Sequence, residues 1–227
     1  MVEDRVSAVT VRVHPTALVE EGVTIGDGTS VWDNVHIRGP ETTIGERCIV
    51  GEKTYIAYGV SIGNLVKINA FVYICNAVTI EDGVMISAGT TFTNDRYPRA
   101  TTSDLAELRP SEPDEHTVAT LVQAGSTIGA RATIGPGVTL GRFSMVGMAS
   151  AVTRDVPDHH LVIGSPARTV AALCRCGEPF ARAIDGNLAD VADVACRLCG
   201  LRYAISAGRV VELSAPGPGH HGPGQQE

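Results

Sequence analysis

Large aliphatic residues recur every six positions along most of this chain. One series starts at Val13, a second starts at Ile44 after a one-residue slip, and a third starts at Val122. Of the 20 positions in these series, 19 are Val, Ile or Leu, and 18 hexads carry Ala, Val, Ser, Thr or Cys four residues further on. A period of six fits neither an amphipathic helix, with a period of about 3.6, nor a continuous strand, with a period of about 2. The pattern therefore predicts short strands separated by turns, with aliphatic residues at Val13, Val19, Ile25, Val31, Ile37, Ile44, Val50, Ile56, Ile62, Ile68, Ile74, Ile80, Ile86, Phe92, Val122, Ile128, Ile134, Leu140, Val146 and Val152.

Three such hexads make one triangular coil of about 18 residues, with the aliphatic side chain inward and the small residue near the corner. Stacked coils then bury one continuous aliphatic column. Gly directly follows the aliphatic residue in eight hexads, as at Gly26 and Gly45, where a turn benefits from the absence of a Cβ. We expect an all-β protein with a parallel solenoid over residues 13–157. A generic antiparallel β-protein would have to produce this register by chance.

The repeat breaks once, at residues 95–121. An insertion in a solenoid has to leave the core as a loop, and long loops on rigid scaffolds often carry function. Its opening places an amide, a carboxylate, two guanidinium groups and a phenol within a few residues. We expect the chemistry here; the alternative is a solvated surface loop. The opening reads Thr93, Asn94, Asp95, Arg96, Tyr97, Pro98 and Arg99.

The six-residue pattern is lost after Val170, and two close cysteine pairs follow. They are Cys174 with Cys176 and Cys196 with Cys199. Two such turns can present four thiolates in a tetrahedron, which favours a structural zinc site over free thiols or disulfides. We therefore predict a small four-cysteine β-domain over residues 171–213. Within it, residues 202–213 are expected to form a hairpin around Ala207 and Gly208. Residues 214–227, rich in Gly and Pro, are expected to form a disordered tail.

The composition of the chain argues against two classes of partner, nucleic acids and membranes. Aromatic residues make up only 4% of the chain, which suits a narrow aliphatic interior. The net charge of −7 argues against a nucleic-acid partner. The chain has no apolar run long enough to span a membrane and no N-terminal signal-peptide pattern, so we expect a cytoplasmic protein without a membrane partner.

Four segments resemble the hexapeptide-repeat acyltransferases, and most closely the bacterial N-acetyltransferases of nucleotide-linked 3-amino sugars. These segments are HPTA at residues 14–17, VWDNVHI at 31–37, FTNDRYPR at 92–99 and IGSPAR at 163–168. The resemblance implies a left-handed parallel β-helix domain over residues 1–170 and a homotrimer with active sites between subunits. It also implies an acyl-coenzyme A co-substrate, acetyl-CoA being expected, and an amino sugar linked to dTDP or UDP. The second cysteine pair resembles a zinc-ribbon knuckle.

The resemblance also suggests roles for particular residues. Asn94 and Asp95 are the catalytic candidates, because a sugar amine can attack a thioester directly once it is aligned and its proton accepted. The cofactor candidates are Gly164, Ala167 and Arg168. The candidates for substrate binding are Trp32, Asn34, His36, Arg38, Arg96, Tyr97 and Arg99.

Several alternatives stay open. If a base is needed, His36 and His116 are the candidates. A general base is more necessary for a hydroxyl acceptor than for an amine acceptor. O-acetylation of a sugar or another small hydroxyl substrate is therefore the main rival activity. A non-catalytic scaffold with a zinc-ribbon docking module is a second rival. A γ-type carbonic anhydrase fits poorly, because the repeat and its insertion offer only His14, His36 and His116 on distant coils.

Overall fold

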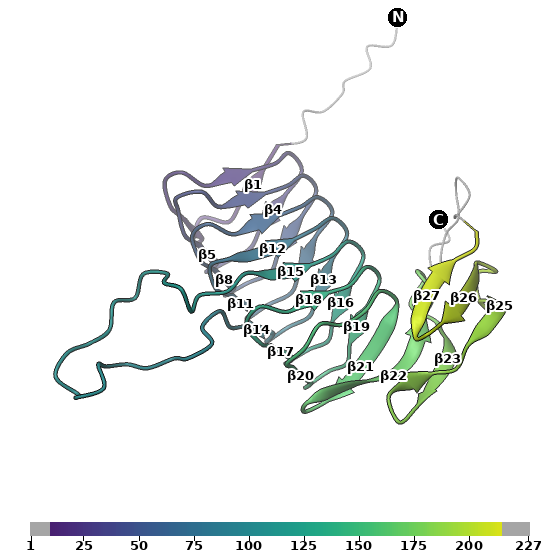
Figure 1. Ribbon diagram of the computed structural model, residues 1–227. Coiled ribbons are helices and arrows are strands. Elements are labelled where there is room, and N and C mark those ends of the chain that lie inside the picture. The colour runs from purple at the N-terminus through teal and green to yellow at the C-terminus, as the bar shows by residue number, and fades with distance from the viewer. Residues whose placement is uncertain (1–9, 215–227) are drawn as a thin grey trace, which may run out of the picture.

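The computed structural model describes residues 10–214, and these residues form 27 strands and no α-helix (Figure 1). Twenty of the strands are the short steps of a β-solenoid whose coils each contribute one strand to each of three parallel sheets. Consecutive strands of a sheet pair in register about one coil apart, as Arg12 does with Ser30 and Ile68 with Ile86. The predicted 18-residue coil is confirmed, while the left hand of the coil stays a prediction.

The three sheets share one strand pattern. In the first sheet the solenoid strands are β1 (Arg12–Val13), β4 (Ser30–Val31), β7 (Ile49–Val50), β10 (Lys67–Ile68), β13 (Met85–Ile86), β16 (Thr127–Ile128) and β19 (Met145–Val146). In the second they are β2 (Leu18–Val19), β5 (His36–Ile37), β8 (Tyr55–Ile56), β11 (Tyr73–Ile74), β14 (Thr91–Phe92), β17 (Thr133–Ile134) and β20 (Ala151–Val152). In the third they are β3 (Thr24–Ile25), β6 (Thr43–Ile44), β9 (Ser61–Ile62), β12 (Val78–Ile80), β15 (Thr120–Val122) and β18 (Thr139–Leu140).

The core is the column of aliphatic side chains that the repeat predicted. Each predicted residue is the last residue of its strand, and from Val31 onward all of them are buried. Val13, in the first coil, keeps 42% of its surface exposed, because the described chain places a neighbouring coil on only one side of it. Each fully buried aliphatic side chain contributes about 1.5–3 kcal/mol to folding, so stacked coils stabilise one another.

The glycines that follow the aliphatic residues are needed for stacking. A Cβ on Gly26 would lie 2.6 Å from the carbonyl carbon of Gly45 in the next coil, and a Cβ on Gly45 would lie equally close to that of Gly63. The left-handed backbone conformation falls elsewhere in the corners, for example at Asn34 and Lys53. The absence of a Cβ therefore lets successive backbones approach, rather than permitting an unusual φ.

The one-residue slip after Ile37 is absorbed at a corner. Thr42 takes the inward small position that strict periodicity would assign to Glu41. Its buried hydroxyl donates to the carbonyl oxygens of Arg38 and Ala57, so the extra residue leaves no unsatisfied hydroxyl. The next strand, β6, then resumes the register.

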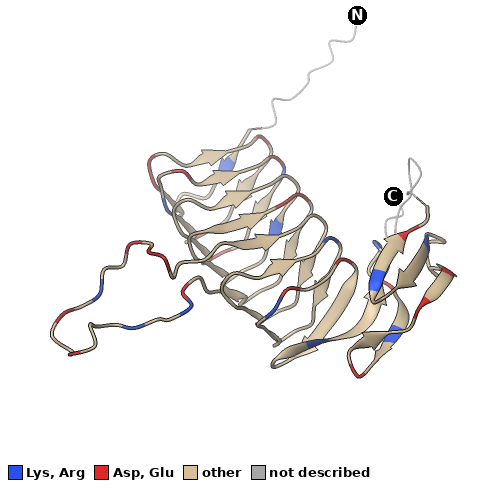
Figure 2. Ribbon diagram, viewed as in Figure 1, with Lys and Arg blue, Asp and Glu red and all other residues tan. Residues whose placement is uncertain are grey.

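The insertion leaves the solenoid after β14 and returns at β15, so it spans residues 93–119 rather than ending at 121. The last two residues assigned to it by sequence pair with β12 instead. The loop has its own bridges, between Asp95 and Thr117 and between Thr101 and Leu108. Figure 2 shows charges of both signs along it.

The C-terminal segment continues the solenoid's first sheet before it forms a sheet of its own. Strand β21 (His160–Gly164) pairs in parallel with β19, and β22 (Ala167–Leu173), β23 (Pro179–Ile184) and β24 (Asn187–Leu188) then extend the sheet in antiparallel order. Strands β25 (Val191–Ala195), β26 (Arg202–Ser206) and β27 (Arg209–Glu212) form a separate three-stranded sheet. The predicted hairpin is confirmed, with Ala207 and Gly208 at its turn. Strand β22 crosses the domain boundary placed at residues 170/171.

Nothing between residues 10 and 214 forms a helix that is long and apolar enough to cross a bilayer. The expected tail lies, apart from Ser214, outside the described residues.

Candidate functional site

A ladder of polar side chains runs along the corner between the second and third sheets. Asn94 follows β14, Asn76 follows β11 and Tyr58 follows β8, each one coil apart. The Asn94 side-chain amide donates to the side-chain oxygen of Asn76, whose own amide donates to the Tyr58 hydroxyl over 3.3 Å. Among the hydrogen bonds of residues 10–214, the Asn94 Oδ1 atom accepts none, so this acceptor is available to a ligand.

This ladder forms one wall of a cleft of about 460 Å³. The insertion folds back toward the solenoid, so that Ser111 and Glu112 form part of the opposite side. The cleft therefore joins residues that lie far apart in the sequence. Its lining residues are Arg38, Tyr55, Ala57, Tyr58, Tyr73, Cys75, Asn76, Asn94, Ser111 and Glu112.

A charged network lies at the early-coil end of this cleft. The Glu20 carboxylate accepts a hydrogen bond from His36 Nε2 over 2.7 Å and lies 3.0 Å from Arg38 Nε. The hydrogen bond from His36 is the main reason that the pKa of Glu20 lies below its ordinary value. The Arg38 guanidinium also donates to the Tyr55 hydroxyl over 3.4 Å, and the His36 ring meets the Tyr55 ring edge-on. A carboxylate-bound histidine is an arrangement that can accept a proton.

Asp95 and Arg99 line a smaller adjoining cavity of about 140 Å³, together with Asn94. The Asp95 carboxylate accepts a hydrogen bond from the Tyr97 backbone amide over 2.7 Å, which closes the turn at the start of the insertion. The Arg109 guanidinium pairs with Asp114 over 2.8 Å and donates to the Tyr97 carbonyl oxygen over 3.3 Å, and the second contact ties the two halves of the loop together. The loop path past the cleft is thus fixed by contacts of its own.

The other residues proposed from sequence for substrate binding lie outside these two cavities in the single chain. Arg96 and Tyr97 are exposed on the loop, and Tyr97 meets the ring of His116 edge-on. Trp32 and Asn34 lie on a different corner, between the first and second sheets. Trp32 faces outward, 41% exposed, with the Arg12 guanidinium 4.9 Å from its ring centre.

The cofactor candidates lie at the hairpin that ends the solenoid. Gly164 closes β21 and pairs with Ala167, the first residue of β22, and Arg168 follows. The Gly164 amide donates to the Ser150 hydroxyl over 3.1 Å, which fastens the hairpin to the last coil. In this single chain these residues are separate from the cleft.

The cleft residues that were not singled out from the sequence include Tyr55, Tyr58, Tyr73 and Asn76. The signal that finds them is the coil length itself. Asn76 and Tyr58 lie one and two coils before Asn94 at the same corner. Tyr55 and Tyr73 pair in register on the second sheet, and their rings stack with centres 5.4 Å apart.

The four C-terminal cysteines converge as predicted. Their sulfur atoms all lie within 4.8 Å of one another, with Cys174 and Cys199 at 3.3 Å and Cys176 and Cys196 at 3.7 Å. Four sulfurs bound to one Zn²⁺ at about 2.3 Å would lie about 3.8 Å apart, so the residues fit a tetrahedral tetrathiolate site. By contrast, Cys48 is buried in the solenoid core.

Comparison with known proteins identifies the repeat. A sequence profile described as the hexapeptide repeat of succinyl-transferase matches residues 41–76 and 124–154. The chain is 38% identical over 94 residues to the dTDP-3-amino-3,6-dideoxy-alpha-D-galactopyranose 3-N-acetyltransferase of Aneurinibacillus thermoaerophilus, covering 41% of this chain and 45% of that protein. It is 30% identical over 132 residues to the galactoside O-acetyltransferase of Escherichia coli (strain K12), covering 56% of this chain and 62% of that one. The chain thus spans less than two thirds of the length of either relative.

Among solved structures, one similar fold is that of AntD, an N-acyltransferase from Bacillus cereus, crystallised with dTDP and coenzyme A. The TM-score is 0.46 at 22% identity, over 74% of this chain and 86% of that one. The hexapeptide repeat itself is matched over residues 41–76 and 124–154.

Proposed function

We propose that this chain is an acyl-coenzyme A dependent N-acyltransferase that acts on a nucleotide-linked amino sugar. The acyl group is proposed to be acetyl and the nucleotide dTDP or UDP. The observation that carries the proposal is the cleft that Asn94 lines together with three tyrosines of the solenoid and two residues of the returning insertion. The similarity to a dTDP-amino-sugar N-acetyltransferase over 94 residues supports the same acceptor class.

The proposed reaction is a direct attack of the sugar amine on the thioester carbonyl. The nitrogen forms the new amide bond as the tetrahedral intermediate collapses, coenzyme A leaves as its thiolate, and the amine gives up one proton. Asn94 suits the first step because its Oδ1 can accept a hydrogen bond from the amine and aim the nitrogen lone pair at the carbonyl. No covalent enzyme intermediate is required. Asp95, which lines the adjoining cavity beside Asn94, is the proposed acceptor of the proton.

Two guanidinium groups supply positive charge for the nucleotide diphosphate. Arg38 lines the cleft and Arg99 the adjoining cavity. A guanidinium fork binds phosphate oxygens bidentately, which orients a diphosphate as well as attracting it. His36, Arg96 and Tyr97 are proposed to contact the substrate, as are Trp32 and Asn34 on the neighbouring corner.

The co-substrate is proposed to be acetyl-CoA or another acyl-CoA, with Gly164, Ala167 and Arg168 contacting it. These residues are separate from the cleft in one chain, so the proposal includes a homotrimer whose active sites lie between subunits. The protein is proposed to act in the cytoplasm. Zinc at the four cysteines is proposed to be structural and to take no part in the transfer.

The test is release of free thiol from acetyl-CoA by the purified protein with dTDP- and UDP-linked 3-amino and 4-amino sugars. Turnover that needs both the acyl-CoA and one amino sugar is the expected result. Absence of thiol release with every acceptor, from a protein that is folded and binds coenzyme A, would overturn the proposal and favour a non-catalytic scaffold.

One observation favours a second candidate, O-acyl transfer to a small hydroxyl substrate. The hydrogen bond between Glu20 and His36, at 2.7 Å, provides the carboxylate-held histidine that a hydroxyl nucleophile needs as its base. The E. coli relative at 30% identity is named as an O-acetyltransferase. Matched amino and hydroxyl acceptors in the same assay distinguish the two reactions.

A further inference from the structure

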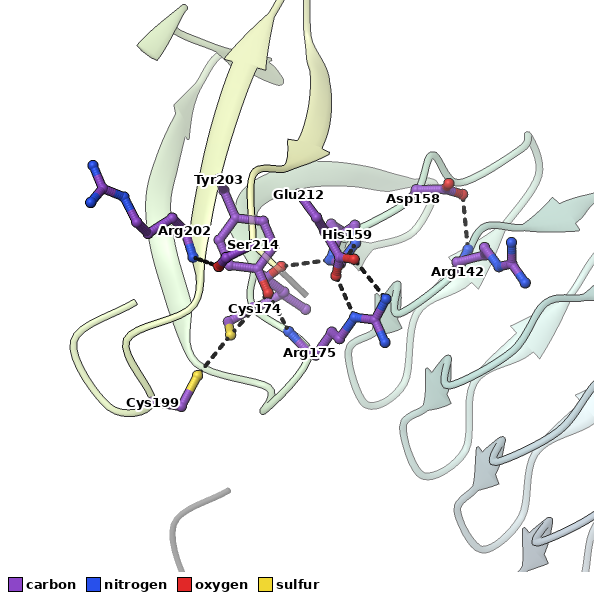
Figure 3. A network of polar contacts seen from close by, with 11 residues as sticks. Arg142, Asp158, His159, Cys174, Arg175, Cys199, Arg202, Tyr203, Glu212 and Ser214 are labelled. Atoms are coloured by element: carbon purple, nitrogen blue, oxygen red, sulfur yellow. Dashed lines mark hydrogen bonds and ion pairs between the residues drawn. The ribbon is translucent and has the colours of Figure 1, made fainter. Parts of the chain in front are cut away.

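The C-terminal segment contains a buried tyrosine whose hydroxyl points at a cysteine sulfur. Tyr203 is fully buried, and its hydroxyl donates to Cys174 Sγ over 3.1 Å (Figure 3). The same hydroxyl accepts a hydrogen bond from the Arg175 backbone amide, also over 3.1 Å. The ring is held in place by stacking on Phe180, with ring centres 4.6 Å apart.

The strength of this hydrogen bond depends on whether its acceptor is a neutral thiol or a thiolate. A neutral thiol is a weak acceptor, whereas a thiolate is charged and forms a much stronger bond with a hydroxyl. A buried hydroxyl that donates to a weak acceptor loses much of the hydrogen bonding it had in water. Tyr203 is therefore placed to donate to Cys174 Sγ as the thiolate that a bound metal ion would stabilise.

The four sulfur atoms lie within 4.8 Å of one another, an arrangement in which a single cation can contact all four. Both cysteine turns are shaped to aim their sulfurs at one point. Gly177 and Gly200 have positive φ angles, and their amides donate over 2.9 Å to the carbonyl oxygens of Cys174 and Cys196, respectively.

We propose that Cys174, Cys176, Cys196 and Cys199 bind one Zn²⁺ and that Tyr203 is a positioning residue that holds the Cys174 thiolate through its hydroxyl. Binding replaces four thiol protons with the metal ion, and the protons pass to solvent. The closed set of four sulfur ligands leaves no open position, so the site is structural. This inference is independent of the proposed transferase activity.

The site joins two sheets. The first cysteine turn follows β22, a strand of the solenoid's first sheet, and the second lies between β25 and β26 of the three-stranded sheet. Next to it, His159 Nε2 lies 3.4 Å from the Glu212 carboxylate, which also pairs with Arg175 (Figure 3). The metal would therefore fasten the three-stranded sheet to the end of the solenoid.

The experiment measures metal in the full-length protein, purified without chelators, by elemental analysis. One zinc per chain is expected, and Cys174→Ser is expected to lose it while Cys48→Ala keeps it. Three results would each overturn the assignment. They are a metal-free protein in which the four cysteines are free thiols, a metal-free protein in which they form two disulfides, and a protein that binds iron in place of zinc.

Tyr203→Phe tests the role of the hydroxyl without removing a ligand. Loss of zinc to a chromogenic chelator should be about 10-fold faster or more, because removing a partner of a metal ligand typically weakens binding by about 10–100-fold. Tyr97→Phe is the matched control. An unchanged rate in Tyr203→Phe would contradict the role of Tyr203.

Because Cys174→Ser can fail to fold, Co²⁺ substitution of the unmutated protein provides a second test of the metal site. A tetrahedral tetrathiolate spectrum is expected, and its absence would overturn the site.

Discussion

The side-chain amide of Asn94 donates a hydrogen bond to the side-chain oxygen of Asn76, one coil earlier in the solenoid. This bond fixes the orientation of the Asn94 amide group, with its nitrogen toward Asn76 and its oxygen available to a ligand. A rigid coil thus positions a side chain that lies at the start of a long insertion.

Replacing Asn94 by Ala should lower kcat for amino-sugar acylation by about 100-fold, because the amine loses the group that aligns it. Asn76→Ala should lower kcat by about 10-fold, because Asn94 remains but is no longer held. Steady-state kinetics measure both effects. Asn187→Ala, in the distant β24 hairpin, is the control and should leave kcat unchanged. Full activity in Asn94→Ala would exclude Asn94 from the reaction centre.

His36→Gln distinguishes an amine acceptor from a hydroxyl acceptor. Gln retains a hydrogen-bond donor toward Glu20 but cannot take up a proton. We expect a loss of less than about 10-fold with an amino sugar, because a general base typically contributes about 100-fold or more where one is needed. A loss of 100-fold or more, measured with the same acceptor, would make His36 the base.

Cys75 lines the cleft but should be chemically unreactive in the folded protein. Burial raises the pKa of its thiol to about 11, so at pH 8 only about one molecule in a thousand carries the reactive thiolate. Alkylation followed by peptide mass analysis should find Cys75 unmodified in the native protein and modified after unfolding in urea. Rapid labelling of the native protein would contradict this burial.

The stability of the solenoid should depend on its inward column. Ile74 is fully buried, and Ile74→Ala should lower the free energy of unfolding by about 2–5 kcal/mol. The same change at Ile184, which is 76% exposed, should cost less than about 0.5 kcal/mol. Chemical denaturation of the two variants gives the comparison. Equal losses would show that the inward column is not the main source of stability.

The solenoid could be predicted almost residue by residue, because a stacked coil repeats its inward positions at a fixed interval. Every aliphatic position from Val13 to Val152 that was counted from the sequence ends a strand. The convergence of the four cysteines also followed from their spacing. In both cases the structure depends on local periodicity or on a known ligand geometry.

The path of the insertion could not be predicted in the same way. Ser111 and Glu112 reach the cleft because Arg109 pairs with Asp114 and Asp95 bridges to Thr117. These contacts join residues without any repeating pattern, so the sequence gives no register for them. Asn76 and Tyr58 could have been predicted from the repeat, since each lies one coil from the next member of the ladder.

The measurement that tests the central claim most directly is identification of the acylated product by mass spectrometry. The purified protein is given acetyl-CoA and a nucleotide-linked amino sugar, with the matched hydroxyl sugar in a parallel reaction. We expect an acetylated amino sugar that resists alkaline hydroxylamine, as an amide does, and little product from the hydroxyl sugar. A hydroxylamine-sensitive ester, formed from the hydroxyl sugar in preference, would contradict it.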